Sequence, residues 1–113
     1  MALAATGKAL GDKNTYGISP EIKRYTLMDL GFTQTKNGNF QLERSLDPNS
    51  PFTAANKLKV TFSKDLSAFQ MSVTTANGLK AINIFTDSKL AENVEQYQYL
   101  VDNLIERNVL QKQ

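Results

Sequence analysis

Residues 88–107 read SKLAENVEQYQYLVDNLIER, and they carry the strongest structural signal in the chain. Apolar side chains recur there at spacings of three and four, which places them along one side of an α-helix. The stripe consists of Leu90, Val94, Tyr97, Val101 and Leu104, widened by Ala91, Leu100 and Ile105. We therefore predict a helix from about Ser88 to Arg107, roughly 30 Å long at 1.5 Å per residue. Such a helix is long enough to cover a small sheet.

Residues at both ends of this segment are typical of helix termini. Asp87 or Ser88 can cap the first turn by accepting a hydrogen bond from a backbone N–H group. Glu92 lies in the first turn, where the helix dipole favours negative charge. Asn108 can adopt the left-handed conformation that often ends a helix.

The segments before this helix have the patterns of antiparallel strands. Asn37-Gly38 separates two β-prone runs, 32–36 and 39–44, and Asn-Gly is typical of a two-residue hairpin turn. In that register Thr35 faces Phe40, and one face of the hairpin is apolar.

Three further runs alternate between apolar and polar residues. They cover 58–62, 69–73 and 79–85, and turn-forming residues separate them. A period of two predicts strands with one face on a core. We therefore expect an antiparallel meander that turns its apolar face toward the helix.

Two short elements are expected upstream of the hairpin. Tyr16–Ile18 is predicted to form a short strand. Ser19-Pro20 has the pattern of a helix start, with Ser as the N-cap and Pro in the first turn. Gly31 would end that short helix as a C-terminal glycine.

The composition excludes many chemistries. The chain has 113 residues, which predicts a single α+β domain over 1–113, and it contains no Cys and no His. Catalytic triads that need imidazole, ordinary zinc sites, and iron–sulfur or haem sites are therefore excluded. The chain also has no glycine-rich phosphate-binding motif and no calcium-loop spacing. We expect no cofactor and no metal site.

The charge balance argues against nucleic-acid and membrane partners. The net charge is +2, and the 13 basic residues are scattered rather than clustered into the basic stripe that nucleic-acid binding requires. No apolar stretch approaches the length of a signal peptide or a spanning helix. We expect a cytoplasmic protein.

Glu43-Arg44 and the loop that follows form the first candidate site. Alternation places Arg44 on the same side as Phe40, where its guanidinium can bind a carboxylate or phosphate with two hydrogen bonds. The alternative is an edge-strand arginine with its head in water. Lys57 precedes the next predicted strand and would supply a second cation for an anionic group.

Two further positions complete the candidate site. The run Thr75-Ala76-Asn77-Gly78 offers a hydroxyl, an amide and backbone N–H groups that can hold an anion. Asn77-Gly78 is equally typical of a hairpin turn. Tyr97 stands on the core stripe, so its phenol is either a ligand contact or a buried group with a satisfied hydroxyl. Tyr99 should be exposed and available to a partner.

Several segments taken together resemble one known family. They are 29–40, 43–47, 75–80, 83–85 and 92–97. As a set they are similar to a family of lactic-acid-bacterial proteins, a domain of unknown function labelled "putative amino acid metabolism". The resemblance covers nearly the whole chain. It implies an α+β fold in which two antiparallel β-sheets pack against a single long C-terminal helix, and a link to amino-acid metabolism including its sulfur branch.

That family is remotely similar in fold to prokaryotic S-adenosylmethionine decarboxylases. Those enzymes form a pyruvoyl group by self-cleavage at a Glu-Ser pair and use His and Cys for proton transfer. This chain has no Glu-Ser pair, no His and no Cys. We therefore carry over no catalytic residue and expect no pyruvoyl-dependent decarboxylation.

We expect a non-catalytic protein that binds a small anionic or amino-acid-like molecule. The candidate ligand-binding residues are Glu43, Arg44, Lys57, Thr75, Asn77, Gly78 and Tyr97. Two alternatives stay open: a protein-interaction module, as a homodimer or as the accessory subunit of an enzyme, and an enzyme that uses Lys, Tyr or carboxylate groups.

Overall fold

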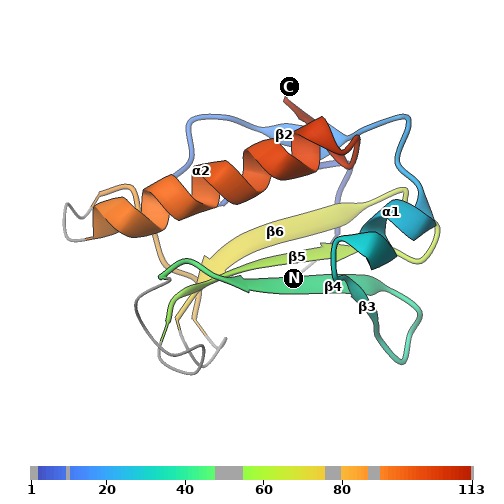
Figure 1. Cartoon of the computed structure of the whole chain (residues 1–113), viewed down its shortest axis with the longest axis horizontal. Coiled ribbons are helices and arrows are strands. Elements are labelled where there is room, and N and C mark those ends of the chain that lie inside the picture. Colours follow the sequence, from blue (N-terminus) through green and yellow to red (C-terminus); the bar gives the residue numbers. More distant parts are fainter. Residues whose placement is uncertain (1–2, 10, 48–54, 76–79, 87–89, 113) are drawn as a thin grey trace.

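The computed structural model describes residues 3–9, 11–47, 55–75, 80–86 and 90–112. Its strands form two antiparallel sheets, as predicted. The larger sheet has the order β3-β4-β5-β6, with β3 at Thr33–Gln34, β4 at Phe40–Ser45, β5 at Lys57–Phe62 and β6 at Phe69–Thr74. The smaller sheet has the order β1-β2-β7, with β1 at Thr6–Gly7, β2 at Tyr16–Ile18 and β7 at Leu110–Lys112. Helix α2 (Ala91–Glu106) and the smaller sheet lie on the same side of the larger sheet (Figure 1).

Strand alternation gives the larger sheet an apolar face and a polar face. Leu58, Val60 and Phe62 of β5 are buried, whereas Lys59 and Thr61 between them are half-buried. Strands β4 and β6 repeat this pattern in register with β5. The apolar face therefore points toward α2, as the meander pattern predicts.

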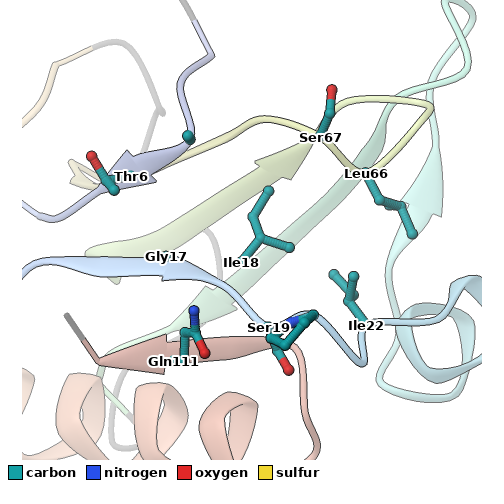
Figure 2. A pocket seen from close by; sticks show the side chains of 10 residues that line it. Thr6, Gly17, Ile18, Ser19, Ile22, Leu66, Ser67 and Gln111 are labelled. Atoms are coloured by element: carbon teal, nitrogen blue, oxygen red, sulfur yellow. The ribbon is translucent and has the colours of Figure 1, made fainter.

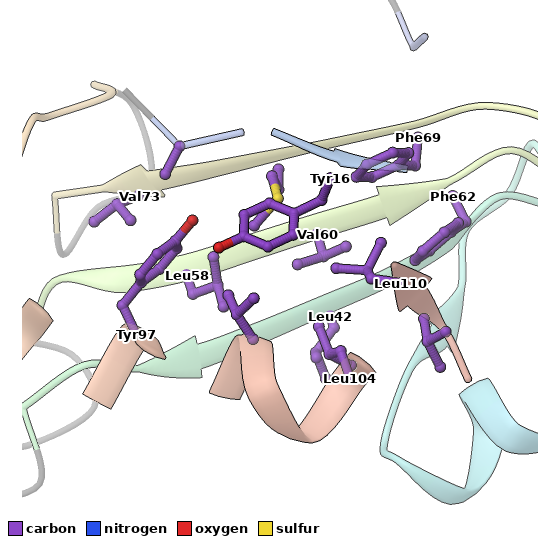
Figure 3. Packing of buried hydrophobic residues seen from close by; sticks show 14 of the residues in the cluster. Tyr16, Leu42, Leu58, Val60, Phe62, Phe69, Val73, Tyr97, Leu104 and Leu110 are labelled. Carbon is purple, nitrogen blue, oxygen red and sulfur yellow. The ribbon is translucent and has the colours of Figure 1, made fainter. Parts of the chain in front are cut away.

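The core lies between this apolar face and the layer of α2 and the smaller sheet. Tyr16 of β2, Tyr97 of α2 and Leu110 of β7 point toward the strands of the larger sheet (Figure 3). At one end of the sheet the rings of Phe62 and Phe69 stack with their centroids 5.4 Å apart. Side chains from distant parts of the chain thus share one apolar cluster.

The β3–β4 hairpin has a different turn from the predicted one. Gln34, not Thr35, pairs with Phe40, which shifts the register by one residue. The Thr35 N–H donates to the Asn39 carbonyl at 2.7 Å, and the Gly38 N–H donates to the Thr35 carbonyl at 2.9 Å. Gly38 alone in this turn has a positive φ, at +89°. These features define a three-residue loop in which only the glycine adopts the left-handed conformation.

Helix α2 confirms the helix predicted from the apolar stripe. Tyr97, Val101 and Leu104 on the stripe are buried. Asn108 has φ +61°, and the N–H groups of Asn108 and Val109 donate to carbonyls of the last turn at 3.1 and 2.9 Å. The helix therefore ends in the left-handed cap that the sequence predicts. The proposed N-cap residues, Asp87 and Ser88, lie outside the described residues.

A second helix, α1 (Arg24–Asp29), corrects the expectation of a single long helix. It ends as predicted, because Gly31 has φ +100° and the N–H of Phe32 donates to the Leu27 carbonyl at 3.0 Å. It begins later than Ser19-Pro20 predicts. The Ser19 carbonyl accepts the Ile22 N–H at 3.1 Å, so this serine forms a turn before the helix.

The predicted strand 79–85 is reduced to a bridge in the described residues. Thr74 pairs with Ala81, and the Ile82 N–H donates to the Val73 carbonyl at 2.9 Å. The segment then leaves the sheet so that Ile84 is buried in the core. Strand β7, which no pattern in the sequence predicts, forms one edge of the smaller sheet.

Candidate functional site

Strand alternation places the predicted site residues on both faces of the larger sheet. Glu43 and Arg44 are neighbours on β4, so their side chains point to opposite faces. Glu43 pairs with Lys59 and faces the same side as Lys57. Arg44 faces α2 together with Leu42. The sheet therefore separates Arg44 from Glu43 and Lys57.

The polar face holds Lys57 at one end of β5. Lys57 is 7% exposed and lies in register between Ser45 of β4 and Thr74 of β6. Thr75 follows at the end of β6, where its N–H donates to the Lys80 carbonyl at 3.0 Å. Lys57 and Thr75 are thus brought to the same end of the sheet. Asn77 and Gly78 lie outside the described residues.

Arg44 opens onto a cavity of about 170 Å³ between the larger sheet and the two helices. The cavity is lined by Asp29, Leu30, Leu42, Arg44, Leu58, Leu100, Asn103 and Leu104. Leu42, Leu58 and Leu104 are buried, whereas Asp29 and Arg44 are exposed. The cavity therefore has an apolar floor and a charged mouth.

The guanidinium of Arg44 is held at the end of α1. Its Nη2 donates a hydrogen bond to the carbonyl of Leu30, the C-cap residue of that helix. A Cβ at Gly31 would lie 2.7 Å from the same Nη2 atom, so a glycine there lets the arginine approach. Within the described part of the chain Arg44 makes no ion pair. Arginine has five N–H donors in a planar fork, and most of them are left for a ligand.

Two polar residues of this cavity were missed by sequence reasoning. Asn103 follows Leu100 by three positions and adjoins Leu104, so the helical spacing that defines the stripe places it beside the apolar face. Asp29 is the last residue of α1, and its position next to the cavity depends on how that helix packs. The helical pattern could have identified Asn103, but no local signal identifies Asp29.

Tyr97 belongs to a buried polar cluster in the core rather than to the cavity. Its hydroxyl donates to the Asp12 carboxylate at 2.6 Å, and the other carboxylate oxygen accepts the Asn14 N–H at 2.9 Å. Tyr97 is 0% exposed and Asp12 is 3% exposed. The prediction of a buried phenol with a satisfied hydroxyl is confirmed, and Asp12 is its unpredicted partner.

Burial and the Asp12 carboxylate also shift the tyrosine pKa values. Desolvation, reinforced by the nearby charge of Asp12, raises the pKa of Tyr16 to about 12. Desolvation and the hydrogen bond to Asp12 raise the pKa of Tyr97 well above its ordinary value. Both phenols are therefore neutral at physiological pH and cannot serve as bases there.

Two larger hollows lie elsewhere on the surface. One, of about 510 Å³, is bordered by Thr6, Ile18, Ser19, Ile22, Leu66 and Ser67, and its lining carries no charged side chain (Figure 2). Another, of about 480 Å³, lies where α1 begins and α2 ends, next to Lys23, Tyr25 and Arg107. The second hollow also carries both signs of charge, through Glu21, Lys23 and Arg107, but none of its described lining residues is buried. The Arg44 cavity is smaller than both hollows and has a buried apolar floor.

The described residues contain neither a cluster of candidate metal ligands nor a membrane-spanning helix. No three acidic side chains gather there in a way that would hold a metal ion. None of the helices in that part of the chain is long and apolar enough to cross a bilayer.

Comparison with known proteins identifies the family. None of the curated proteins matches the chain. A crystal structure of a DUF1831 family protein from Lactobacillus plantarum is 49% identical in sequence, with a TM-score of 0.91. The similarity covers 100% of this chain and 99% of that one. The model of the DUF1831 family, described as "Putative amino acid metabolism", matches residues 1–111. The chain therefore belongs to the DUF1831 family.

Proposed function

We propose that this protein is a non-catalytic binder of a small carboxylate-bearing metabolite of amino-acid metabolism. The observation that carries the proposal is the Arg44 guanidinium at the mouth of an apolar-floored cavity of about 170 Å³. A binding site of this kind combines apolar walls with a few well-placed polar groups.

The chemistry of Arg44 favours a carboxylate. A guanidinium fork matches the two oxygens of a carboxylate and binds them with charge-assisted hydrogen bonds. The bond from Nη2 to Leu30 fixes the head group at the cavity, so a ligand does not have to order a free side chain. Such preorganisation lowers the entropic cost of binding.

The family description supports the link to amino-acid metabolism, and the composition supports a non-catalytic role. The family description links its members to amino-acid metabolism. The absence of His and Cys removes the side chains that most often transfer protons near neutral pH. We place this binding activity in the cytoplasm, where free amino acids and their keto and hydroxy acid derivatives are available.

To test the proposal, the protein is titrated with aliphatic carboxylates, and binding is measured by calorimetry and by thermal shift. We expect binding by the wild type and an affinity about tenfold lower for Arg44→Gln, because a hydrogen bond to a charged group is lost. Arg44→Lys keeps the charge but not the fork, so its affinity should lie between the two.

Arg24→Gln is the matched control for the arginine change. Arg24 is also exposed and also donates to a backbone carbonyl, that of Lys64 at 3.5 Å, but it does not line the cavity. Its removal should leave ligand affinity unchanged. The proposal is wrong if no carboxylate binds at millimolar concentration, or if Arg44→Gln binds as tightly as the wild type.

A second candidate function, protein–protein interaction, is favoured by three exposed apolar side chains. Tyr25 and Met28 are 65% and 53% exposed on α1, and Tyr99 is 67% exposed on α2, as its position off the stripe predicts. Exposed tyrosines are common anchors of protein interfaces. Light scattering tests whether the chain self-associates, and a Tyr25→Ser variant should abolish any association through α1.

A further inference from the structure

We infer that the ligand of the Arg44 cavity is a zwitterionic α-amino acid with an aliphatic side chain, and that Asp29 binds its ammonium group. This inference rests on the proposed function, because it assigns the second charge and the apolar part of the same ligand.

Two opposite charges lie at the cavity mouth. Asp29 and Arg44 line the same small space, yet among the described residues neither forms an ion pair with the other or with a third group. A ligand with only a carboxylate would bring its negative charge close to Asp29. A ligand with both charges can place its carboxylate against Arg44 and its ammonium group against Asp29, because opposite charges attract and like charges repel.

The cavity changes from charged at its mouth to apolar at its floor. The exposed charges of Asp29 and Arg44 lie at the mouth, and the buried side chains of Leu42, Leu58 and Leu104 form the floor. An amino acid has the same division, since its charged groups sit at one end and its side chain at the other. The floor is made of leucines and holds no buried polar side chain, so it favours an aliphatic side chain.

Asn103 also lines the cavity and offers a third polar group to the ligand. Its side chain is half-buried and has no hydrogen-bond partner among the described residues. An amide both donates and accepts, so it can bind either the carboxylate or the ammonium group. A ligand that lacks the matching polar group would leave the Asn103 amide without a hydrogen-bond partner. The site therefore discriminates against such analogues.

The size of the cavity also suits a small ligand. A volume of about 170 Å³ equals that of roughly six water molecules at about 30 Å³ each. Sites for drug-sized ligands are larger, at about 300–1,000 Å³. The cavity is therefore smaller than those sites, and a single amino acid is a ligand of suitable size for it.

Three related compounds and one variant test this inference. Leucine carries both charges, 4-methylpentanoate lacks the ammonium group, and 3-methylbutylamine lacks the carboxylate. We expect the wild type to bind leucine most tightly, with affinities at least fivefold lower for the other two compounds. Asp29→Asn should weaken leucine binding about fivefold or more, and it should leave 4-methylpentanoate binding unchanged or improved.

The control variant is Asp102→Asn. Asp102 is an exposed carboxylate on α2, adjacent to Asn103 in sequence, but it does not line the cavity. Both variants lose one exposed negative charge and therefore have the same net charge. A difference in their leucine affinity is then due to the position of Asp29 at the cavity. Asp102→Asn should bind leucine like the wild type.

The outcomes separate this inference from the proposed function. If 4-methylpentanoate binds as tightly as leucine and Asp29→Asn leaves leucine binding unchanged, the zwitterion assignment is wrong while the carboxylate site at Arg44 stands. If tryptophan binds as tightly as leucine, the aliphatic assignment is wrong. If none of the carboxylates binds, both proposals fail.

Discussion

The hydroxyl of Tyr97 on α2 donates a 2.6 Å hydrogen bond to the carboxylate of Asp12, a residue 85 positions earlier in the chain. Both groups are buried, so water cannot replace either partner. The bond connects the loop before β2 to the middle of the long helix. It therefore holds the N-terminal part of the smaller sheet against the core.

Removing this hydroxyl should destabilise the protein. In Tyr97→Phe the buried carboxylate of Asp12 loses the hydroxyl that donates to it, which costs roughly 1–3 kcal/mol. Urea denaturation followed by circular dichroism measures the loss. Tyr99→Phe is the matched control, because Tyr99 is 67% exposed on the same helix and its stability change should lie near zero. Equal effects of the two changes would contradict a structural role for the Tyr97–Asp12 bond.

The free energy of unfolding should fall in strong alkali, because Tyr16 and Tyr97 lie buried beside Asp12 and have raised pKa values. The pKa of Tyr16 is raised to about 12 in the folded state from 10.0 in the unfolded chain, so the folded state retains this proton over a range where the unfolded state has lost it. This contribution is complete below pH 10 and is lost as the pH rises to about 12. The loss amounts to roughly 2–3 kcal/mol, and the raised pKa of Tyr97 adds to it.

Urea denaturation at a series of pH values tests this dependence. The free energy of unfolding should decline between pH 10 and 12, and Tyr16→Phe should reduce the decline. A decline of unchanged size in Tyr16→Phe would show that Tyr16 does not take part in it.

Gly31 should affect both stability and ligand binding. With φ at +100°, an alanine there costs roughly 1–2 kcal/mol, and its Cβ would also displace Nη2 of Arg44. Gly38→Ala imposes a comparable backbone strain at φ +89°, but the nearest atoms are those of the flexible Lys64 side chain. Both variants should be less stable in denaturation experiments, whereas only Gly31→Ala should bind a carboxylate more weakly. A normal affinity in Gly31→Ala would argue against Arg44 as the anchor.

Filling the cavity should block binding without changing any charge. Leu100 is half-buried and lines the cavity, so Leu100→Phe adds volume where we propose that the ligand side chain sits. Leucine affinity measured by calorimetry should fall by at least tenfold. Ile105→Phe enlarges another half-buried side chain of α2 outside the cavity and should leave the affinity unchanged. Unaltered leucine binding by Leu100→Phe would place the site elsewhere.

Local sequence signals predicted the elements that local interactions determine. The apolar stripe, the left-handed Asn108 and the terminating Gly31 depend on neighbours within one or two helical turns, and each was found where expected. Strands β5 and β6 followed from alternation for the same reason.

The structure differs from the sequence-based predictions where an element depends on pairing or packing with residues far away in the sequence. Leu110–Lys112 is too short to show a strand pattern, and it becomes β7 only because Tyr16–Ile18 lies beside it. Asn37-Gly38 favours a two-residue turn locally. In the structure β4 pairs with β3 on one side and with β5 on the other, and the loop between β3 and β4 has three residues. The candidate site shows the same limit: alternation identified Arg44 on the α2 side, whereas Asp29 reaches the cavity only through the packing of α1.

The pairing of β2 with β7 has a consequence for how the protein is made. Ile18 pairs with Leu110 and Tyr16 pairs with Lys112, so the smaller sheet joins two segments that lie far apart in the sequence. During synthesis the four strands of the larger sheet can pair before α2 has left the ribosome, but β2 has no partner on its second edge until residue 112 is free. Pairing between such distant residues forms late and slowly. The smaller sheet therefore becomes complete only after residues 110–112 can reach residues 16–18, which makes this pairing a late step of folding.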